Sequence, residues 1–242
     1  MQYAGFASVY DALMRDVPYA DWISFILEKT SIPEGAQAFD AACGTGSALI
    51  QLLKHGLKAT AMDISEEMLL IASERLRREG KRAQLIEGDI SNFSLHRPVS
   101  LITCICDGVN YLIQPGDAQN FFSRAYRFLK EGGALAFDIS GAYKLAEMLP
   151  GNLFYEDGED ITYFWQSQYE DGLCKMELTF FVRQENGLYE RFDERHFQRA
   201  YSGDEIRGML EKSGFNRIEC WDGYNDRPAA ENSERLLFIA YK

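Results

Sequence analysis

The segment from Phe39 to Ser47, which reads FDAACGTGS, constrains the fold of this chain more than any other. Apolar residues run into it from Ala36, and residues with helical spacing follow it from Ala48. The pattern predicts a strand, a tight glycine turn and a helix. Glycine at such a turn permits a positive φ and lets a ligand touch the backbone where a Cβ would collide. Because the following helix offers free N–H groups and the positive end of its dipole, we expect a ligand in the crevice at the strand's carboxyl end.

The two glycines of this turn, Gly44 and Gly46, fit one ligand class better than another. The dinucleotide fingerprint G-x-G-x-x-G needs a third glycine, and that position holds Leu49. The longer string DAACGTG, from Asp40 to Gly46, resembles the first motif of class I S-adenosylmethionine (SAM)-dependent methyltransferases, which usually reads D-x-G-C-G-T-G. Ala42 replaces one glycine of that motif. We expect its methyl group to be tolerated if Ala42 keeps an ordinary backbone conformation.

Two carboxylates follow at the ends of the next predicted strands. Residues 58–64 read as a strand that brings Asp63 to its tip, where a carboxylate can accept hydrogen bonds from both hydroxyls of a ribose. NAD enzymes share this feature, so Asp63 indicates a nucleoside without choosing the cofactor. The next strand leads into Gly88-Asp89-Ile90, which resembles the adenine-binding motif of the same methyltransferase family. The resemblance implies that Asp89 accepts a hydrogen bond from the adenine amine and that the Ile90 N–H donates to a ring nitrogen.

The resemblance also implies further contacts with SAM. The glycine turn is expected to admit the methionine portion, and the carbonyl of Ala42 to receive its ammonium group. Met68 packs either against adenine or in the core. The string VYDALM from residue 9 resembles the start of a small bacterial methyltransferase group, in which N-terminal aromatic residues close over SAM. Tyr3 and Tyr10 either do this or are packing aromatics. The residues predicted to contact SAM are Tyr3, Tyr10, Ala42, Gly44, Gly46, Asp63, Ile64, Met68, Asp89, Ile90 and Cys106.

Polar residues follow the fourth predicted strand, residues 99–106, at the position that faces the SAM methyl group in this family. The candidates are Asp107, Asn110 and Tyr111, although Asn110 fits a local turn equally well. Methyltransferases that act on nucleobase amines typically carry Asn/Asp-Pro-Pro-Tyr/Phe here. This chain lacks that string, which disfavours a nucleic-acid base as the methyl acceptor.

The pattern changes between residues 152 and 199, where apolar residues alternate as in half-buried strands. We predict strands over 161–169, 173–184 and 188–200, joined by hairpin turns at Asp171-Gly172 and Asn186-Gly187. An antiparallel sheet inserted here forms either a cap over the site or an oligomer face. Within it, Trp165, Glu194 and Arg199 are predicted to line a substrate pocket. His196 is either a structural histidine or, like Asp107, a base that removes a proton from the acceptor.

These elements together predict an α/β fold, namely a Rossmann-like, doubly wound, mostly parallel seven-stranded sheet with an inserted antiparallel β cap. The last two core strands are expected at 217–222 and 235–241, after a helix that begins near residue 203. The predicted domains are an N-terminal helical lid (1–35), a SAM-binding core (36–150), the β cap (151–201) and the C-terminal part of the core (202–242).

Composition limits the partners of the chain. A formal net charge of −12 argues against nucleic acid and against an anionic membrane surface, since both require clustered Lys and Arg. The 5 cysteines have no paired spacing, which predicts reduced thiols and a cytoplasmic location. Cys104 and Cys106 fit buried small apolar residues better than a zinc site, and no metal is expected. We see no membrane-spanning run.

The function favoured by these observations is SAM-dependent methylation of an unidentified small molecule by a monomer or homodimer. In this chemistry an acceptor lone pair attacks the sulfonium methyl in line with the departing sulfur, so the protein mainly positions and desolvates the reactants. An NAD-dependent oxidoreductase remains an alternative, although the missing third glycine is against it. A catalytically silent SAM-binding regulator is a further alternative.

Overall fold

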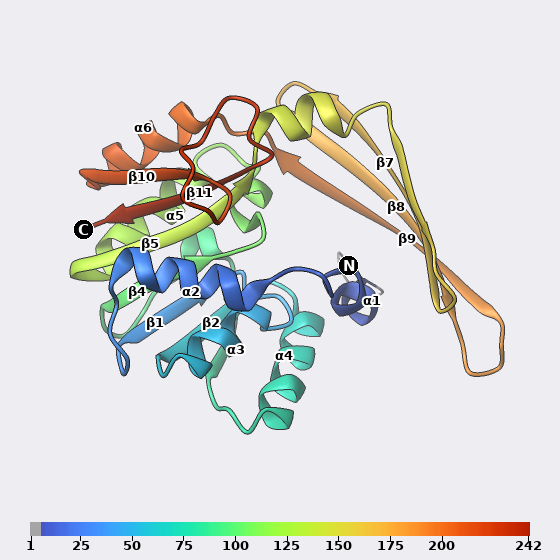
Figure 1. Cartoon of the computed structure of the whole chain (residues 1–242), viewed down its shortest axis with the longest axis horizontal. Coiled ribbons are helices and arrows are strands. Elements are labelled where there is room, and N and C mark those ends of the chain that lie inside the picture. Colours follow the sequence, from blue (N-terminus) through green and yellow to red (C-terminus); the bar gives the residue numbers. More distant parts are fainter. Residues whose placement is uncertain (1–5) are drawn as a thin grey trace.

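The computed structural model describes residues 6–242, so the predicted cofactor residue Tyr3 lies outside the described residues. Seven strands form the central sheet in the order β10-β11-β5-β4-β1-β2-β3 (Figure 1). Only β11 runs against its neighbours. This arrangement confirms the predicted mostly parallel, Rossmann-like sheet. The strands are β1 (Gln37–Ala41), β2 (Lys58–Asp63), β3 (Gln84–Glu87), β4 (Val99–Cys104), β5 (Leu129–Ser140), β10 (Arg217–Asp222) and β11 (Arg235–Tyr241).

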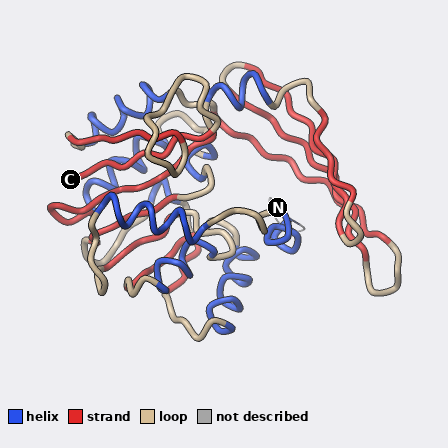
Figure 2. Tube along the Cα trace, in the orientation of Figure 1, coloured by secondary structure: helices blue, strands red, loops and turns tan. Residues whose placement is uncertain are grey.

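Helices cover both faces of this sheet because successive residues of a strand point to opposite sides. Ala38 packs into a cluster with Ile23 and Leu49 on one face, whereas Phe39 packs into a cluster with Phe121 on the other. The first face carries α2 (Tyr19–Thr30), α3 (Ser47–Lys54) and α4 (Glu66–Arg78), and the second carries α5 (Asp117–Phe128) and α6 (Gly203–Ser213). Figure 2 shows the resulting three layers.

A second sheet projects from the core as a long antiparallel arm (Figure 1). It confirms the predicted inserted cap sheet but has four strands instead of three: β6 (Leu153–Asp157), β7 (Ile161–Glu170), β8 (Leu173–Arg183) and β9 (Tyr189–Arg199). The sequence analysis missed β6. This strand is an edge strand that is exposed along its whole length, so it lacks the alternation of buried and exposed residues that reveals a strand. Asp171 and Gly172 both have positive φ, as the predicted tight hairpin requires.

One strand boundary in the core lies close to a run of glycines. Strand β5 begins at Leu129, directly after Phe128, the last residue of α5. Leu129 pairs with Val99 of β4, and the pairing register shifts before Leu101 meets Ala134. The glycines in this strand therefore form an irregularity inside it, and they do not separate it from the helix.

Short helices complete the chain around the carboxyl ends of the parallel strands. They are α1 (Phe6–Leu13), the 3₁₀ turns Ile90–Asn92 and Gly108–Tyr111, and a π-helical turn at Lys144–Met148. Helix α1 lies between the core and the arm (Figure 1), where the ring centroid of Phe6 is 5.8 Å from that of Phe180 on β8. No helix among residues 6–242 is long and apolar enough to cross a membrane.

Candidate functional site

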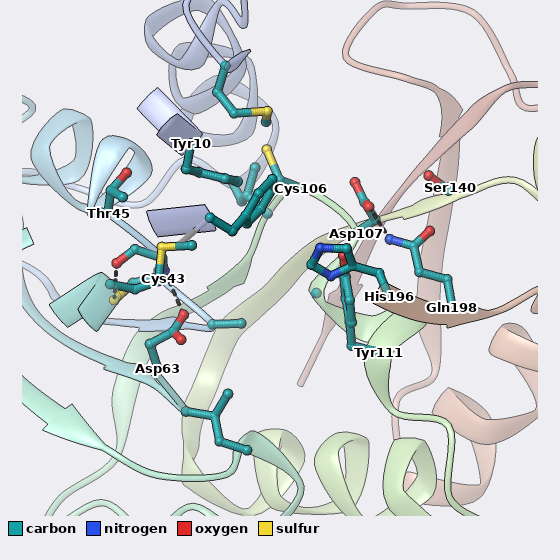
Figure 3. Close-up of a pocket in the computed structure, with 18 of the residues that line it drawn as sticks. Tyr10, Cys43, Thr45, Asp63, Cys106, Asp107, Tyr111, Ser140, His196 and Gln198 are labelled. Atoms are coloured by element: carbon teal, nitrogen blue, oxygen red, sulfur yellow. Dashed lines mark hydrogen bonds between the residues drawn. The ribbon is translucent and has the colours of Figure 1, made fainter. Parts of the chain in front are cut away.

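A cavity of about 470 Å³ lies at the carboxyl ends of the parallel strands, bounded by the core, by α1 and by the cap. Figure 3 shows residues of the glycine turn on one side and residues of the cap on the other, with Cys106 between them. The predicted site residues that line it are Tyr10, Ala42, Gly44, Asp63, Ile64, Met68, Asp89, Ile90, Cys106, Asp107, Tyr111, Trp165 and His196.

The glycine turn adopts left-handed backbone conformations at three positions, with φ of +55° at Ala42, +53° at Gly44 and +81° at Gly46. The condition under which the Ala42 methyl group was expected to be tolerated, an ordinary backbone conformation, is therefore not met. Its Cβ faces Gly108, where an added Cβ would lie 3.0 Å away. Gly46 does not line the cavity; it faces Ala72, whose Cβ would lie 3.2 Å from a Cβ added at Gly46. Gly46 thus permits close packing of α4 against the turn.

Asp63 holds the turn in place from the tip of β2. Its Oδ2 accepts a hydrogen bond from the Gly44 N–H at 2.7 Å, and its Oδ1 accepts one from the Ser65 N–H at 3.0 Å. Burial raises the pKa of Asp63, while these two N–H groups oppose part of the rise. Each carboxylate oxygen has a second lone pair, so Asp63 retains the capacity to accept hydrogen bonds from a ligand.

Beyond Asp63 the cavity wall is largely apolar. Met68 is buried, whereas Ile64 is 64% exposed, and both line the cavity. Asp89 lies at the start of the 3₁₀ turn, where its Oδ1 accepts a hydrogen bond from the Ser91 N–H at 2.7 Å. Asp89 and Ile90 line the cavity together with Ile64 and Met68.

Asp40 is a cavity residue that the sequence analysis did not select. It lies at the end of β1 and is 1% exposed. Its Oδ1 accepts a hydrogen bond from the Thr103 hydroxyl at 2.7 Å, but no group within residues 6–242 bonds to its Oδ2. Burial raises the pKa of Asp40 to about 7. The sequence did contain a signal for Asp40, namely a carboxylate within an apolar strand. Burying an acid without a full set of partners costs free energy, so an acid in such a strand indicates a function.

Helix α1 forms a roof over the glycine turn. The Cε1 of Tyr10 lies 3.9 Å from the place that a Cβ on Gly44 would occupy. Asp11, one residue further on, accepts a hydrogen bond from the Thr45 hydroxyl at 2.6 Å and forms an ion pair with Arg75. These bonds attach the roof to the turn that it covers.

On the other side of the cavity, Asp107 is fixed by three elements. Its N–H donates to Oδ1 of Asp138 on β5 at 2.8 Å. Its own carboxylate accepts from Gln198 Nε2 of β9 at 2.6 Å and from Arg235 Nη1 of β11 at 3.1 Å (Figure 3). Arg235 also pairs with Asp138 at 2.5 Å. The sequence analysis did not select Gln198, Arg235 or Asp138, because only the folded chain brings them to Asp107.

The two residues predicted as bases both have low pKa values. Burial alone would raise the pKa of Asp107, but Arg235, Lys144 and Gln198 outweigh it and hold that pKa below its usual range. Burial lowers the pKa of His196 to about 4, and Asp107 opposes part of that change. The His196 ring packs 5.0 Å from Phe6. At neutral pH, Asp107 is therefore an anion and His196 is neutral, and both are weak proton acceptors.

Three residues predicted to face the substrate lie elsewhere, and those predictions are corrected. Asn110 is fully buried; its amide donates to the Arg199 carbonyl at 2.9 Å and its oxygen accepts from the Ser140 N–H at 2.9 Å. Asn110 therefore joins the core to the cap. The Arg199 side chain is directed to Glu205, with 3.7 Å between the charged atoms. Glu194 is half-buried on β9 and does not line the cavity.

The described residues contain no cluster of three or more His, Cys, Asp and Glu side chains suited to a metal ion. One half of the cavity therefore offers carboxylates, an apolar slot and the backbone of the glycine turn. The other half offers Asp107, a neutral histidine and the aromatic inner face of the cap. Such a cavity can hold a nucleoside-containing cofactor beside a second small molecule.

Comparisons with known proteins agree with this geometry. Residues 38–133 match a family described as a methyltransferase domain. A putative methyltransferase of Geobacillus sp. (strain WCH70) is 36% identical over 248 residues, which cover 100% of both chains. The dTDP-4-amino-2,3,4,6-tetradeoxy-D-glucose N,N-dimethyltransferase of Saccharopolyspora spinosa is 25% identical over 86% of this chain and 84% of its own.

A solved structure extends the similarity to the whole fold. The crystal structure of a SAM-dependent methyltransferase from Clostridium acetobutylicum ATCC 824 superposes with a TM-score of 0.90 at 37% identity. The match covers 99% of this chain and 98% of the other. The similarity therefore includes the cap and α1 as well as the central sheet.

Proposed function

The chain belongs to the class I SAM-dependent methyltransferases, and on that premise we propose that it methylates a small molecule bound in the cap-lined half of the cavity. The observation that carries the proposal is that one cavity contains both the glycine turn and the inner face of the cap. The relative from Saccharopolyspora spinosa is named for a dTDP-linked amino sugar, which supports a small-molecule acceptor. The net charge of −12 disfavours nucleic acid as the acceptor.

The residues that line the other half suit the parts of SAM. Asp63 would accept hydrogen bonds from the ribose hydroxyls, and Asp89 with the Ile90 N–H would bind adenine between Ile64 and Met68. The glycine turn and the Ala42 carbonyl would meet the methionine portion.

The fit is supported by Asp40, whose buried Oδ2 has no bonding partner in the described part of the chain. An ammonium group at this position would supply the missing hydrogen bond. Asp40 is therefore added to the proposed SAM residues, and Tyr10 is proposed to cover the methionine portion from above.

When bound, SAM supplies a methyl group on a sulfonium, which is already activated for displacement by a lone pair. The chain's own residues would then bind and align the acceptor and exclude water. Asp107 is held rigidly by its three partners, and α1 closes the cavity between the turn and the cap. Alignment of this kind corresponds to effective molarities on the order of 10⁵–10⁸ M in well-oriented pairs.

Calorimetric titration with SAM, S-adenosylhomocysteine and NAD tests the cofactor. We expect the first two to bind, and tight NAD binding without SAM binding would contradict the proposal in favour of an oxidoreductase. Transfer of a radiolabelled methyl group to a panel of amines, phenols, alcohols, carboxylates and nucleosides tests turnover. SAM binding without transfer to any small molecule or cell extract would instead support a silent regulator.

We also propose a cytoplasmic location, because all five cysteines are free thiols and burial is the first cause that raises the pKa of each. Labelling of these thiols in intact cells and after lysis tests it. Complete protection by disulfides in the native protein would contradict this location.

A further inference from the structure

The acceptor half of the cavity is lined by two carboxylates and two cations, and a further buried carboxylate lies behind them; this arrangement bears on the atom that is methylated. The charged residues that line it are Asp107, Asp117, Lys144 and Arg235. Behind them, Asp138 is fully buried and pairs with Arg235. With Asp138 included, the carboxylates in and behind this wall outnumber the cations by three to two. An anionic nucleophile in this chamber would meet unfavourable electrostatics, because charges interact strongly where water is excluded.

Asp107 places this negative charge at the junction of the two halves. Its φ is +54° and that of Cys106 is +65°, so two successive non-glycine residues adopt the left-handed conformation. Such strain persists only where surrounding contacts impose it, and it is frequent at functional sites. Here the contacts are the bonds to Asp138, Arg235 and Gln198. They aim the carboxylate into the cavity between the cofactor residues and the cap (Figure 3).

Asp107 and His196, the two residues predicted as bases, are both poorly suited to remove a proton from the acceptor. Asp107 is stabilised as an anion by Arg235, and His196 is kept neutral by its burial beside Phe6. An aliphatic hydroxyl must lose its proton to become a good nucleophile, and neither residue is suited to remove it at neutral pH. A phenolate or carboxylate would bring a second negative charge beside Asp107. A neutral amine has neither difficulty, since its lone pair is available with all of its hydrogens in place.

We propose that the acceptor is an amine that is methylated on nitrogen, and that the Asp107 carboxylate orients it. This inference rests on the proposed methyl transfer. The nitrogen lone pair forms the new N–C bond while the C–S bond of the sulfonium breaks, and the electrons of that bond remain on sulfur. The nitrogen keeps its hydrogens and becomes an ammonium, which releases a proton to water after the product leaves. Positive charge moves toward Asp107 during the step, so this carboxylate binds the transition state more tightly than the neutral amine.

Matched acceptors test the choice of nucleophile. Benzylamine, benzyl alcohol and benzoate form one set, and cyclohexylamine, cyclohexanol and cyclohexanecarboxylate form a second. Binding is measured by ligand-observed NMR on the protein saturated with S-adenosylhomocysteine, and methyl transfer is measured with radiolabelled SAM. We expect the amine of each set to bind best and to be the member that is methylated. A set in which the amine has no advantage in either measurement overturns the proposal.

The pH profile of transfer tests the lack of an enzymic base. With an aliphatic and an aromatic amine, the rise in rate with pH should follow the pKa of each free amine, so the two profiles should be displaced from one another. Two profiles that bend at the same pH would reveal a base on the enzyme and would overturn this part of the inference. This measurement uses the unaltered protein.

Asp107→Asn tests the carboxylate itself. Asparagine tolerates the left-handed conformation, and the Gln198 amide can rotate to present its oxygen, so the fold should persist. We expect transfer to the amine to fall on the order of 100-fold with SAM affinity unchanged. Asp193→Asn on the exposed face of β9 is the matched control and should not affect transfer. Unchanged transfer in Asp107→Asn would refute the role of Asp107. A different result, failure of the unaltered protein to bind SAM, would refute the methyltransferase proposal itself.

Discussion

The two halves of the cavity are built in different ways. The cofactor half consists of the tips of neighbouring parallel strands, so Asp40, Asp63 and Asp89 meet there as soon as the sheet forms. The acceptor half depends on Gln198 and His196, which belong to a separate antiparallel sheet. The central strands β1 and β4 are almost wholly buried, whereas the cap has large exposed aromatics such as Tyr155 at 67%. The comparison teaches that a local motif builds the cofactor half and that long-range contacts build the acceptor half.

The largest effect on stability is expected for the ion pair between Asp138 and Arg235, beside the cavity. Asp138 is fully buried, and Asp138→Ala leaves the half-buried Arg235 with a less complete set of partners. Removing one member of such a pair typically costs about 3–5 kcal/mol of unfolding free energy. Urea denaturation at neutral pH measures it. A loss no larger than that for a surface ion pair of the cap would remove the energetic difference between the two regions.

A smaller effect is expected for SAM binding when the cofactor half is changed. Asp63→Ala should weaken SAM binding by about 1–3 kcal/mol, because ribose hydroxyls and the Gly44 N–H lose their acceptor. Trp165→Ala in the cap removes aromatic surface from the same cavity and should leave SAM affinity unchanged. Calorimetry on both variants measures the difference. Equal losses of SAM affinity in the two variants would mean that SAM and the acceptor do not bind in separate halves of the cavity.

Acid should separate stability from cofactor binding through Asp40. Its pKa rises from 3.8 to about 7 in the folded protein because of burial, so the folded state binds an extra proton between these values. The Asp40 contribution to stability therefore declines as pH rises from about 4 to about 7 and is constant above that. SAM affinity should instead increase as the pH rises toward 7, because ionised Asp40 is proposed to bind the ammonium group of SAM. Below pH 7 the affinity should fall by at most about tenfold per pH unit.

Asp40→Asn is the matched variant for this pH dependence. It keeps an acceptor for the Thr103 hydroxyl but cannot ionise. Ligand-free Asp40→Asn should be more stable than the natural sequence at pH 8, and its SAM affinity should be low and independent of pH. Titrations from pH 5 to pH 8 measure both quantities. An unaltered pH profile of SAM affinity in the variant would exclude Asp40 as the responsible group.

A modest gain in stability is expected from relieving strain in the glycine turn. Ala42→Gly removes a side chain from a residue at φ +55° and should stabilise the protein by about 1 kcal/mol. Ala41→Gly, on the preceding buried strand residue, is the control and should destabilise it. Thermal unfolding of the two variants tests the sign of each change. Destabilisation by both would show that the methyl group of Ala42 contributes more through packing than it costs in strain.

The smallest effect is expected at the outer face of the cap. Asp193→Asn breaks an ion pair with Arg191 in which both side chains are about 60% exposed. Exposed pairs of this kind contribute little, so the change in unfolding free energy should be below about 0.5 kcal/mol. The same urea series that is used for Asp138→Ala measures it. A large loss here would show that the cap is as tightly coupled to overall stability as the core.

The amino-acid sequence by itself determined the central sheet, because its motifs act over short distances. A strand, glycines and a helix in succession specify the turn at Gly44. The alternation of helices and strands along the chain favours strands that run parallel to one another. The same local logic predicted that Asp63 lies at the tip of β2 and that Asp89 follows β3. The antiparallel sheet of the cap could also be predicted from the sequence, because hairpin turns and the alternation of apolar and polar residues are local features.

Only the tertiary structure decided which polar residues meet in the acceptor half. Asp107 is bonded to Gln198, 91 residues away, and to Arg235, 128 residues away, and no local pattern reports such distant pairs. For the same reason Asn110 looked like a site residue but is a buried link between core and cap. The left-handed conformation of Ala42 was equally hidden, since the turn geometry is imposed by packing of the folded chain around it. Periodicity and turn chemistry act between neighbours in the chain, whereas ionisation and side-chain direction depend on what the completed fold places around each group.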